Sequence, residues 1–163
     1  MTLLIARGTL ADVAETDALI RATAEWLIKK GEQLWGPNET SLDELARVTR
    51  MGELILGRVE GELATCMYLH DEDRVFWPHV GRGEAFYIHR LAVARKFAGR
   101  GYAHAMLEWA ASEARAHGRP FLRLDCEPRA KLLAIYASAG YRRIDSTPIQ
   151  VGEHFVVRHE KRV

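Results

Sequence analysis

A glycine-rich turn carries the clearest chemical signal in the sequence. The run Leu91-Ala-Val-Ala-Arg-Lys-Phe-Ala-Gly-Arg-Gly-Tyr-Ala103 joins the end of a β-type segment to the start of a long amphipathic one. Gly99 and Gly101 can adopt backbone conformations that other residues resist, and they allow a ligand to approach the main chain closely. The first amides of a helix lack internal hydrogen-bond partners and carry partial positive charge, so they suit a phosphate or a pyrophosphate. On spacing alone, an ordinary connection with solvated basic residues is an equal alternative.

Basic residues favour the phosphate interpretation of this turn. Arg95, Lys96 and Arg100 place positive charge beside the expected helix start. The other nucleotide-binding turns fit less well, because the sequence contains neither the Gly-x-x-x-x-Gly-Lys run of a P-loop nor the Gly-x-Gly-x-x-Gly run of a Rossmann turn. A small polyanion needs only this local field, even though the whole chain is nearly neutral.

Tyr136 and His89 are the candidates for moving protons. A phenol has a pKa of about 10 and is protonated at neutral pH, whereas an imidazole with a pKa of about 6.5 can accept a proton there. His89 falls two residues before Leu91 on the same expected strand. From the residues alone, Tyr136 is better explained as a core aromatic beside Leu132 and Leu133. A structural histidine explains His89 equally well.

The elements that must position these residues alternate between strand and helix patterns. Two capping pairs open the first two helices, and a Glu-Gly dipeptide marks a hairpin. The expected strands are Thr2–Arg7, Glu53–Val59, Glu62–Leu69, Glu84–Val93, Phe121–Cys126, about Tyr141–Asp145 and Glu153–Glu160. The expected helices run from Thr9 to about Lys30, from Ser41 to about Arg50, from Gly99 to His117 and from Pro128 to Ala139. The order β-α-α-β-β-β-α-β-α-β-β predicts an α/β or α+β fold with helices on the faces of a sheet.

The strand over Glu84–Val93 is expected to carry several candidate residues on a single face. Period-2 alternation along an uninterrupted strand places every second side chain on the same side of the sheet. The residues expected on that face are Ala85, Tyr87, His89, Leu91 and Val93.

Length and composition exclude several classes of protein. The 163 residues are 48% hydrophobic and 28% charged, with 23 Lys plus Arg against 22 Asp plus Glu. This balance predicts one globular domain over residues 1–163 and disfavours disorder and nucleic-acid binding. No apolar run is long enough for a membrane span, and the N-terminus lacks a signal-peptide layout. Cys66 and Cys126 are too few for a disulfide framework and fit a reducing cytoplasm.

Two motifs, in order, resemble those of a known family. Leu91-Ala-Val93 followed by Ala98-Gly-Arg-Gly-Tyr-Ala103 resembles the acetyl-CoA motif of the GNAT superfamily of N-acetyltransferases, Gln/Arg-x-x-Gly-x-Gly/Ala at a strand-to-helix junction. Downstream, Leu132-Leu-Ala-Ile-Tyr136-Ala-Ser-Ala-Gly140-Tyr141 resembles the family's helix signature, a Tyr four residues before Gly-Phe or Gly-Tyr. The order of elements is similar over nearly the whole chain. The resemblance implies a single GNAT-like domain with a mixed, mostly antiparallel sheet, acetyl-CoA as co-substrate and no metal.

The resemblance places the cofactor along the strand end and the turn. The residues that it assigns to cofactor binding are Leu91, Ala92, Val93, Ala98, Gly99, Arg100, Gly101, Tyr102 and Ala103. Ala98 stands where the family usually has Gln or Arg, so that side-chain contribution is absent while the backbone amides are unaffected. Arg129 stands seven residues before Tyr136, where the family often has Asn. Positive charge in a helix's first turn is mildly unfavourable, which leaves room for Arg129 to face the cofactor.

The resemblance also assigns the proton transfers of an acyl transfer. It gives Tyr136 the role of acid toward the leaving thiolate, and some family members carry His at the position of His89, our candidate base, which acts alone or through a water. Tyr87 and Glu84 are the substitutes for His89, and a backbone N–H near Val93 is expected to stabilise the oxyanion. No serine lies in a Gly-x-Ser-x-Gly elbow, so direct attack in a ternary complex is the simpler mechanism. Cys126 is a weak alternative as an acyl carrier.

The acceptor site is the least specified part of the prediction. Aromatic residues lie in the segments that, by resemblance, cover the acceptor: Trp26, Trp35, Phe76, Trp77 and His79. They suit cation–π contact with an amine, although ordinary packing of loops onto the sheet explains them better. Trp35, Trp77, Glu84 and Tyr87 are the candidate substrate residues. We therefore expect an N-acetyltransferase acting on a primary amine of a small molecule or peptide, with homodimerisation suggested by the resemblance. The alternative is a non-catalytic acyl-CoA-binding or regulatory domain of the same fold.

Overall fold

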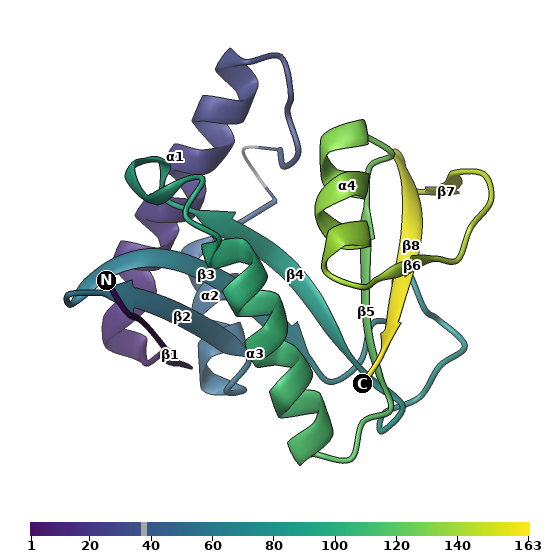
Figure 1. The fold of residues 1–163 in the computed structure, drawn as a ribbon. Coiled ribbons are helices and arrows are strands. Elements are labelled where there is room, and N and C mark those ends of the chain that lie inside the picture. Colours follow the sequence, from purple (N-terminus) through teal and green to yellow (C-terminus); the bar gives the residue numbers. More distant parts are fainter. Residues whose placement is uncertain (37–38) are drawn as a thin grey trace. The chain divides into compact units, whose positions relative to one another are not determined.

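The computed structural model describes residues 1–36 and 39–163 (Figure 1). The chain divides into two compact units. The first unit comprises Met1–Tyr68 and Arg90–Met106, and the second comprises Leu69–His89 and Leu107–Val163. The two units are interleaved in the sequence, because the chain passes from one to the other three times. Neither unit is therefore a continuous stretch of chain.

The first unit holds an antiparallel set of strands, with two helices between its first and second strands in the sequence. Strand β1 pairs with β2, and β2 pairs with β3, both in antiparallel register. Its elements are β1 (Leu3–Arg7), η1 (Leu10–Asp12), α1 (Val13–Lys29), α2 (Leu42–Arg50), β2 (Leu54–Val59), most of β3 (Glu62–His70), the end of β4 (Ala85–Val93), η2 (Arg95–Phe97) and the start of α3 (Tyr102–Ala116).

Local sequence signals explain how these elements begin and turn. The backbone N–H of Thr9 donates to the Asp12 carboxylate at 2.7 Å, and the Ser41 hydroxyl accepts from the Glu44 amide at 3.1 Å. Both expected capping pairs are confirmed, although a short 3-10 turn precedes α1. Glu60 and Gly61 both have positive φ, 52° and 85°, which is the backbone of a tight hairpin turn. The expected hairpin between β2 and β3 is also confirmed.

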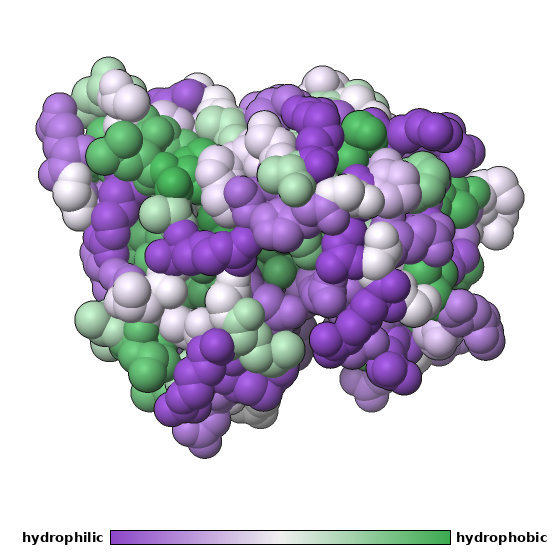
Figure 2. All heavy atoms as spheres, turned by 90° about the horizontal axis from the view of Figure 1, so that it is seen from below, coloured by the Kyte–Doolittle hydropathy of each residue, from purple (hydrophilic) through white to green (hydrophobic). Residues whose placement is uncertain are grey.

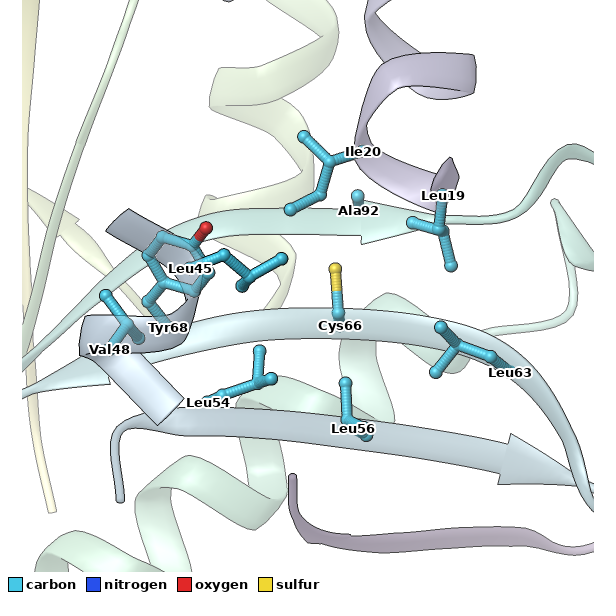
Figure 3. Close-up of a cluster of buried hydrophobic side chains, with 10 residues drawn as sticks. All are labelled: Leu19, Ile20, Leu45, Val48, Leu54, Leu56, Leu63, Cys66, Tyr68 and Ala92. Carbon is cyan, nitrogen blue, oxygen red and sulfur yellow. The ribbon is translucent and has the colours of Figure 1, made fainter. Parts of the chain in front are cut away.

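A buried cluster joins the two helices of the first unit to its strands (Figure 3). Side chains from α1 and α2 meet side chains from β2, β3 and the end of β4. The members of the cluster are Leu19, Ile20, Leu45, Val48, Leu54, Leu56, Leu63, Cys66, Tyr68 and Ala92. Cys66 is a fully buried free thiol in this cluster, as expected for a small core residue.

The second unit is built on a long antiparallel pair. Strand β5 (Phe121–Cys126) pairs with β8 (His154–Arg162) along its whole length, and it pairs in parallel with β4 at Ala85, Phe86 and Tyr87. The strand order is β1-β2-β3-β4 in the first unit and β4-β5-β8-β6 in the second. The other elements are the remainder of α3, α4 (Ala130–Ser138), β6 (Arg142–Arg143) and β7 (Ile149–Val151). The predicted fold class, a mixed and mostly antiparallel sheet flanked by helices, is confirmed.

The region before β8 differs from the expectation. The strand expected near Tyr141–Asp145 shortens to β6, because the Asp145 carboxylate leaves the strand to accept from the backbone N–H and the guanidinium of Arg158. Strand β7 was not expected, since it is only three residues long. It pairs with the start of β8 through a turn at Gly152, whose φ is 60°.

Strand β4 corrects the expectation of one continuous face. Arg90 has a φ of 52°, and an extra residue in such a conformation breaks the period-2 alternation of a strand. Ala85 and Tyr87 pack together with Trp77 before this point. After it, Ala92 is buried in the cluster of Figure 3, whereas Leu91 and Val93 are half-buried. The five predicted residues therefore do not share one face.

The described residues include no helix of the length and apolar character that a membrane span requires. On the face drawn in Figure 2, hydrophilic residues are interspersed with hydrophobic ones, in keeping with the balanced composition of the chain.

Candidate active site

The glycine turn before α3, in the first unit, is shaped by two residues with positive φ. Gly99 has a φ of 76° and Gly101 a φ of 79°, a region that favours glycine. A Cβ added at either glycine meets no atom of the described chain within 4 Å. The Gly101 carbonyl accepts from the Ala105 amide at 3.0 Å, so α3 begins directly after Gly101, and its first turn holds no acidic residue. The amides of that turn are thus suited to an anion.

Three basic residues beside the turn have different surroundings. The Lys96 ammonium pairs with the Glu62 carboxylate. The Arg95 guanidinium lies 3.7 Å from the centroid of the Trp26 ring. Arg100 is exposed, lies 5.6 Å from the centroid of the Phe97 ring and forms no ion pair with any residue that the structure describes. Of the three, only Lys96 has an ion pair among the described residues, and the exposed Arg100 lies farther from its neighbouring ring centroid than Arg95 does, 5.6 Å against 3.7 Å.

A cavity of about 310 Å³ adjoins this turn within the first unit. Its lining combines the hairpin between β2 and β3 with η2 and the turn itself. The lining residues are Met1, Val59, Glu60, Glu62, Lys96, Phe97 and Arg100. The cavity lining therefore combines apolar surface with two basic and two acidic side chains, and one of the basic side chains, Lys96, pairs with Glu62.

Apolar packing holds the turn in place. Phe97 and Tyr102, on either side of the glycines, have ring centroids 6.1 Å apart and pack with Val59 and Ala64. The end of β4 is tied to β3, because the Thr65 hydroxyl donates to the Ala92 carbonyl at 2.7 Å and the Ala94 amide donates to the Ala64 carbonyl at 2.8 Å. The nine residues from Leu91 to Ala103 that the motif singles out therefore lie on one strand–turn–helix segment of the first unit, where Ala98 and Ala103 are half-buried.

His89 lies in the second unit between two carboxylates. Its Nε2 is 2.9 Å from Asp73 Oδ2, and its Nδ1 is 3.9 Å from Asp125 Oδ1. The ring packs beside His70 and Phe76, with centroids 5.3 and 6.3 Å away. About a quarter of the His89 side chain is exposed, against 5% for Asp73 and 11% for Asp125. The imidazole is the accessible member of this group.

Asp73 is held as an anion by its own loop. Its Oδ1 accepts from the amides of Val75 and Phe76 at 3.0 and 2.9 Å. Burial disfavours the charged carboxyl group, but the hydrogen bond and charge of His89, together with the two amides, outweigh burial and hold the pKa of Asp73 below its usual value. Asp73 therefore accepts hydrogen bonds at neutral pH and donates none.

Tyr136 lies on α4 in the second unit, packed against other aromatic rings. Its ring centroid is 6.0 Å from that of Tyr141 and 5.8 Å from that of His159. Burial raises the pKa of Tyr136 above its usual value, and the negative charge of Asp125 adds to the effect. The phenol is thus fully protonated at neutral pH. Asp125 acts electrostatically on Tyr136 and also faces His89, so these candidate residues belong to one neighbourhood of the second unit.

Cys126 is poorly suited to carry an acyl group. It is 8% exposed at the end of β5, and burial raises the pKa of its thiol to about 12. The thiolate is the nucleophilic form of cysteine, so almost none is present at neutral pH.

Glu84 and Tyr87 are bound by Arg123 in the second unit. Arg123 donates to Glu84 Oε1 at 2.7 Å, to Glu160 Oε2 at 2.8 Å and to the Tyr87 hydroxyl at 3.3 Å. Tyr87 is fully buried, and burial raises its pKa. Glu84 keeps about half of its side chain exposed. Of these two candidates, only Glu84 is open to solvent.

The remaining candidates are occupied by neighbours in their own units. Trp77 is 5% exposed, with its ring centroid 5.4 Å from that of Tyr87. Trp35, in the first unit, is half-buried beneath the Arg90 guanidinium at 5.4 Å. Arg129 occupies the N-cap position of α4 in the second unit without a side-chain capping hydrogen bond, and it pairs with Glu127 at 2.6 Å. The two tryptophans have packing partners within their own units.

Sequence reasoning missed Asp73 and Asp125. Asp73 lies in an irregular loop 16 residues before His89, and no spacing rule connects the two. Asp125 had a weak signal, since it is an acidic residue in the otherwise apolar end of a strand. An ionisable residue at such a position usually has a partner. That position was the one feature of the sequence that indicated a role for Asp125.

Comparisons with known proteins relate this chain to one family. The profile of the Acetyltransferase (GNAT) family matches residues 18–142. An uncharacterised N-acetyltransferase of Bacillus subtilis, YesJ, is 30% identical over 137 residues, which is 80% of this chain and 76% of that protein.

Solved structures are similar to the whole chain. A GNAT-family acetyltransferase from Listeria monocytogenes gives a TM-score of 0.83 at 23% identity, covering 99% of this chain and 95% of that one. The PaiA N-acetyltransferase from Thermoplasma acidophilum, crystallised with coenzyme A, gives 0.77 at 13% identity and covers both chains fully. The match to the family profile and the relative from Bacillus subtilis establish the relationship, and this chain belongs to the GNAT family of acetyltransferases.

Proposed function

We propose that the chain is a single acetyltransferase domain over residues 1–163 that transfers an acetyl group from acetyl-CoA to a primary amine of a small molecule or peptide. The observation that supports this most is the turn at the start of α3, where Gly99 and Gly101 have positive φ and a Cβ added at either would meet no described atom within 4 Å. A relative of the same fold was crystallised with coenzyme A. Acetyl-CoA would supply the activated acetyl thioester.

The turn fits a pyrophosphate through its backbone. The amides at the start of α3 would bind the phosphate oxygens, with Arg100 adding an unpaired positive charge. Ala98 contributes no polar side chain, so the affinity comes mainly from the amides. Leu91 and Val93 would line the pantetheine, with a backbone N–H near Val93 as the oxyanion donor. The Ala92 side chain is buried in the core cluster, so Ala92 would contribute only through its backbone.

Two side chains of the second unit would move the protons. His89 would accept a proton from the attacking amine, alone or through a water, because its imidazole is partly exposed. Tyr136 would donate a proton to the leaving sulfur, since its raised pKa keeps the phenol protonated at neutral pH. We propose direct attack in a ternary complex, without an acyl-enzyme, because Cys126 is held as a thiol.

One observation favours a second candidate, a non-catalytic acyl-CoA-binding or regulatory domain. Ala98 stands at the position where the family usually has Gln or Arg. Tyr136 argues against this alternative, because a domain that only binds the cofactor does not need a protonated phenol on α4.

We also propose a cellular compartment and binding partners for the protein. Both cysteines are free thiols, which fits a reducing cytoplasm. We expect the partners to be an amine acceptor and a second copy of the chain, and neither nucleic acid nor a membrane. Light scattering during size-exclusion chromatography tests the dimer.

Thermal unfolding and thiol release test the function in two steps. Acetyl-CoA and CoA should each raise the unfolding temperature over buffer, because a ligand that binds only the native state stabilises it; no shift with either ligand would contradict both candidates. A panel of amines with acetyl-CoA should then give thiol release with at least one acceptor. Clear binding with no release on a broad panel would favour the non-catalytic alternative.

A further inference from the structure

Two aspartates flank the proposed base within the second unit. Asp73 Oδ2 lies 2.9 Å from His89 Nε2, and Asp125 Oδ1 lies 3.9 Å from His89 Nδ1. We propose that Asp73 is a positioning residue, which holds His89 in the tautomer whose Nδ1 is free to take the proton of the acceptor amine. This inference rests on the proposed function, in which His89 is the base.

The geometry of Asp73 determines which nitrogen of His89 carries the proton. One carboxylate oxygen is fixed by the amides of Val75 and Phe76, at 3.0 and 2.9 Å, and the other faces His89 Nε2. An ionised carboxylate only accepts hydrogen bonds, so Nε2 must be the donor. In the neutral imidazole, Nδ1 is then the atom with the lone pair.

The other side of the ring is arranged to receive a proton. The 3.9 Å between Nδ1 and Asp125 Oδ1 is too long for a hydrogen bond, so the carboxylate does not hold a proton on Nδ1 in the resting state. When Nδ1 is protonated, this carboxylate is close enough to stabilise the imidazolium. The other titratable group packed against the ring is His70, at a centroid distance of 5.3 Å.

The proton transfers of the reaction balance when His89 is the base and Tyr136 is the acid. The amine nitrogen bonds to the acetyl carbon, and the carbon–sulfur bond breaks. One amine proton moves to His89 Nδ1, and the Tyr136 phenol gives its proton to the sulfur. Transfer of the His89 proton to the Tyr136 phenolate through solvent then restores both residues, so Asp73 keeps its charge throughout.

The first test reads the tautomer of His89 directly in the intact protein. In a long-range ¹H–¹⁵N spectrum recorded at alkaline pH, where imidazoles are neutral, we expect His89 to be protonated at Nε2. The His89→Gln variant assigns the signal among the seven histidines. Protonation at Nδ1 in the wild-type protein would overturn the inference, and this result needs no aspartate variant and no acceptor.

The second test is Asp73→Asn. The amides of Val75 and Phe76 need an acceptor, so the Asn oxygen should face them and its NH₂ should face His89. This NH₂ donates to Nε2 and favours the opposite tautomer, with Nδ1 protonated. We expect kcat to fall about 10²–10⁴-fold, the range of general-base catalysis, with KM for acetyl-CoA unchanged. Unchanged kcat, or an unchanged tautomer, would refute the positioning role.

Two controls distinguish the positioning role from a general loss of stability and from metal binding. Asp145→Asn removes another largely buried carboxylate of the second unit, one that pairs with Arg158. This variant should leave the His89 tautomer unaltered even if the protein is less stable.

Asp73, His89 and Asp125 are also spaced closely enough to hold a metal ion. Stoichiometric Zn²⁺ binding that removes the Nε2 proton would assign the cluster to a metal and overturn the inference. Inactivity of the wild-type protein on every amine, by contrast, would overturn the proposed function itself.

Discussion

The turn before α3 and the histidine cluster of the second unit achieve their chemistry in different ways. In the turn, the proposed functional groups are backbone amides, and two glycines with positive φ leave open space around their α-carbons. In the cluster, the functional groups are side chains drawn from a loop, β4 and β5, at positions 73, 89 and 125. The turn should therefore tolerate changes in polar side chains but no added bulk. The cluster should respond even to a substitution such as Asp73→Asn, which replaces one carboxylate oxygen by an amide nitrogen.

Charge is also handled differently in the two regions. The turn has no acidic residue in the first turn of its helix, and Arg100 is exposed to solvent. The cluster holds its carboxylates 5% and 11% exposed around a partly exposed imidazole. Salt should weaken the interactions of the first region more than those of the second, because buried pairs are screened less.

The largest expected effect follows from Gly101→Val. The valine side chain would project into the open space over the turn, where we place the pyrophosphate, and a β-branched residue is strained at a φ of 79°. We expect CoA affinity to fall by more than about 100-fold, the loss of several charge-assisted hydrogen bonds, as measured by calorimetry.

Gly118→Val is the matched control for this substitution. Gly118 ends α3 with a φ of 64°, and a Cβ there also meets no described atom within 4 Å. Both variants should lose about 1–2 kcal/mol of stability from strain, but Gly118→Val should bind CoA normally. Equal affinity losses in the two variants would show that strain, not the position of the turn, is responsible.

The next largest effect is expected from the loss of the Tyr136 hydroxyl oxygen in the second unit. Tyr136→Phe removes the proposed acid, and we expect kcat to fall about 100-fold with CoA affinity unchanged. The rate should show no alkaline decline from Tyr136 up to about pH 10, because the raised pKa keeps the phenol protonated there.

Tyr141→Phe supplies the comparison for Tyr136→Phe. The Tyr141 hydroxyl is buried and has no hydrogen-bond partner among the described residues, so its removal should cost no stability and little activity. A wild-type rate in Tyr136→Phe, or an equal loss of rate in Tyr141→Phe, would remove Tyr136 from the role of acid.

The sequence predicts the turn much better than the cluster, for a physical reason. The turn, the caps at Thr9 and Ser41 and the hairpin at Glu60 are local, so residue types within a few positions determine them. The pairing of Asp73 with His89 depends on how a loop folds back on a strand, and no short-range pattern records it. The positive φ of Arg90 was equally unforeseeable, because the residue type carries no bulge signal.

Alkaline unfolding tests a feature that the two units share. Burial raises the pKa of Cys66 in the first unit and of Cys126 in the second to about 12. The unfolded chain releases these protons first as the pH rises through about 9, so stability is full below that pH and is lost above it. At pH 10 the loss should be about 1.4 kcal/mol for each thiol.

Cys66→Ala and Cys126→Ala should each remove one such contribution. Urea unfolding at pH 8 and pH 10 would show a smaller pH dependence in either variant than in the wild-type protein. The tyrosines with raised pKa, Tyr68 among them, also make the free energy of unfolding depend on pH, so part of the dependence remains in both variants. An unaltered slope would mean that the thiol is not shielded from water in the native protein.

The smallest effect distinguishes two arginines of the turn region. Arg100 has no ion pair within the described chain, whereas Arg95 stacks on Trp26 at 3.7 Å. Arg100→Ala should weaken CoA binding about 3–10-fold and reduce its salt dependence, since one exposed charge near a phosphate contributes about 1 kcal/mol. Arg95→Ala should instead lower the free energy of unfolding by about 1 kcal/mol through the lost stacking. Calorimetry at two salt concentrations and urea unfolding measure the two quantities. If Arg95→Ala weakened CoA binding more than Arg100→Ala, the cofactor's phosphates would lie beside η2, and the amides at the start of α3 would not be their main ligand.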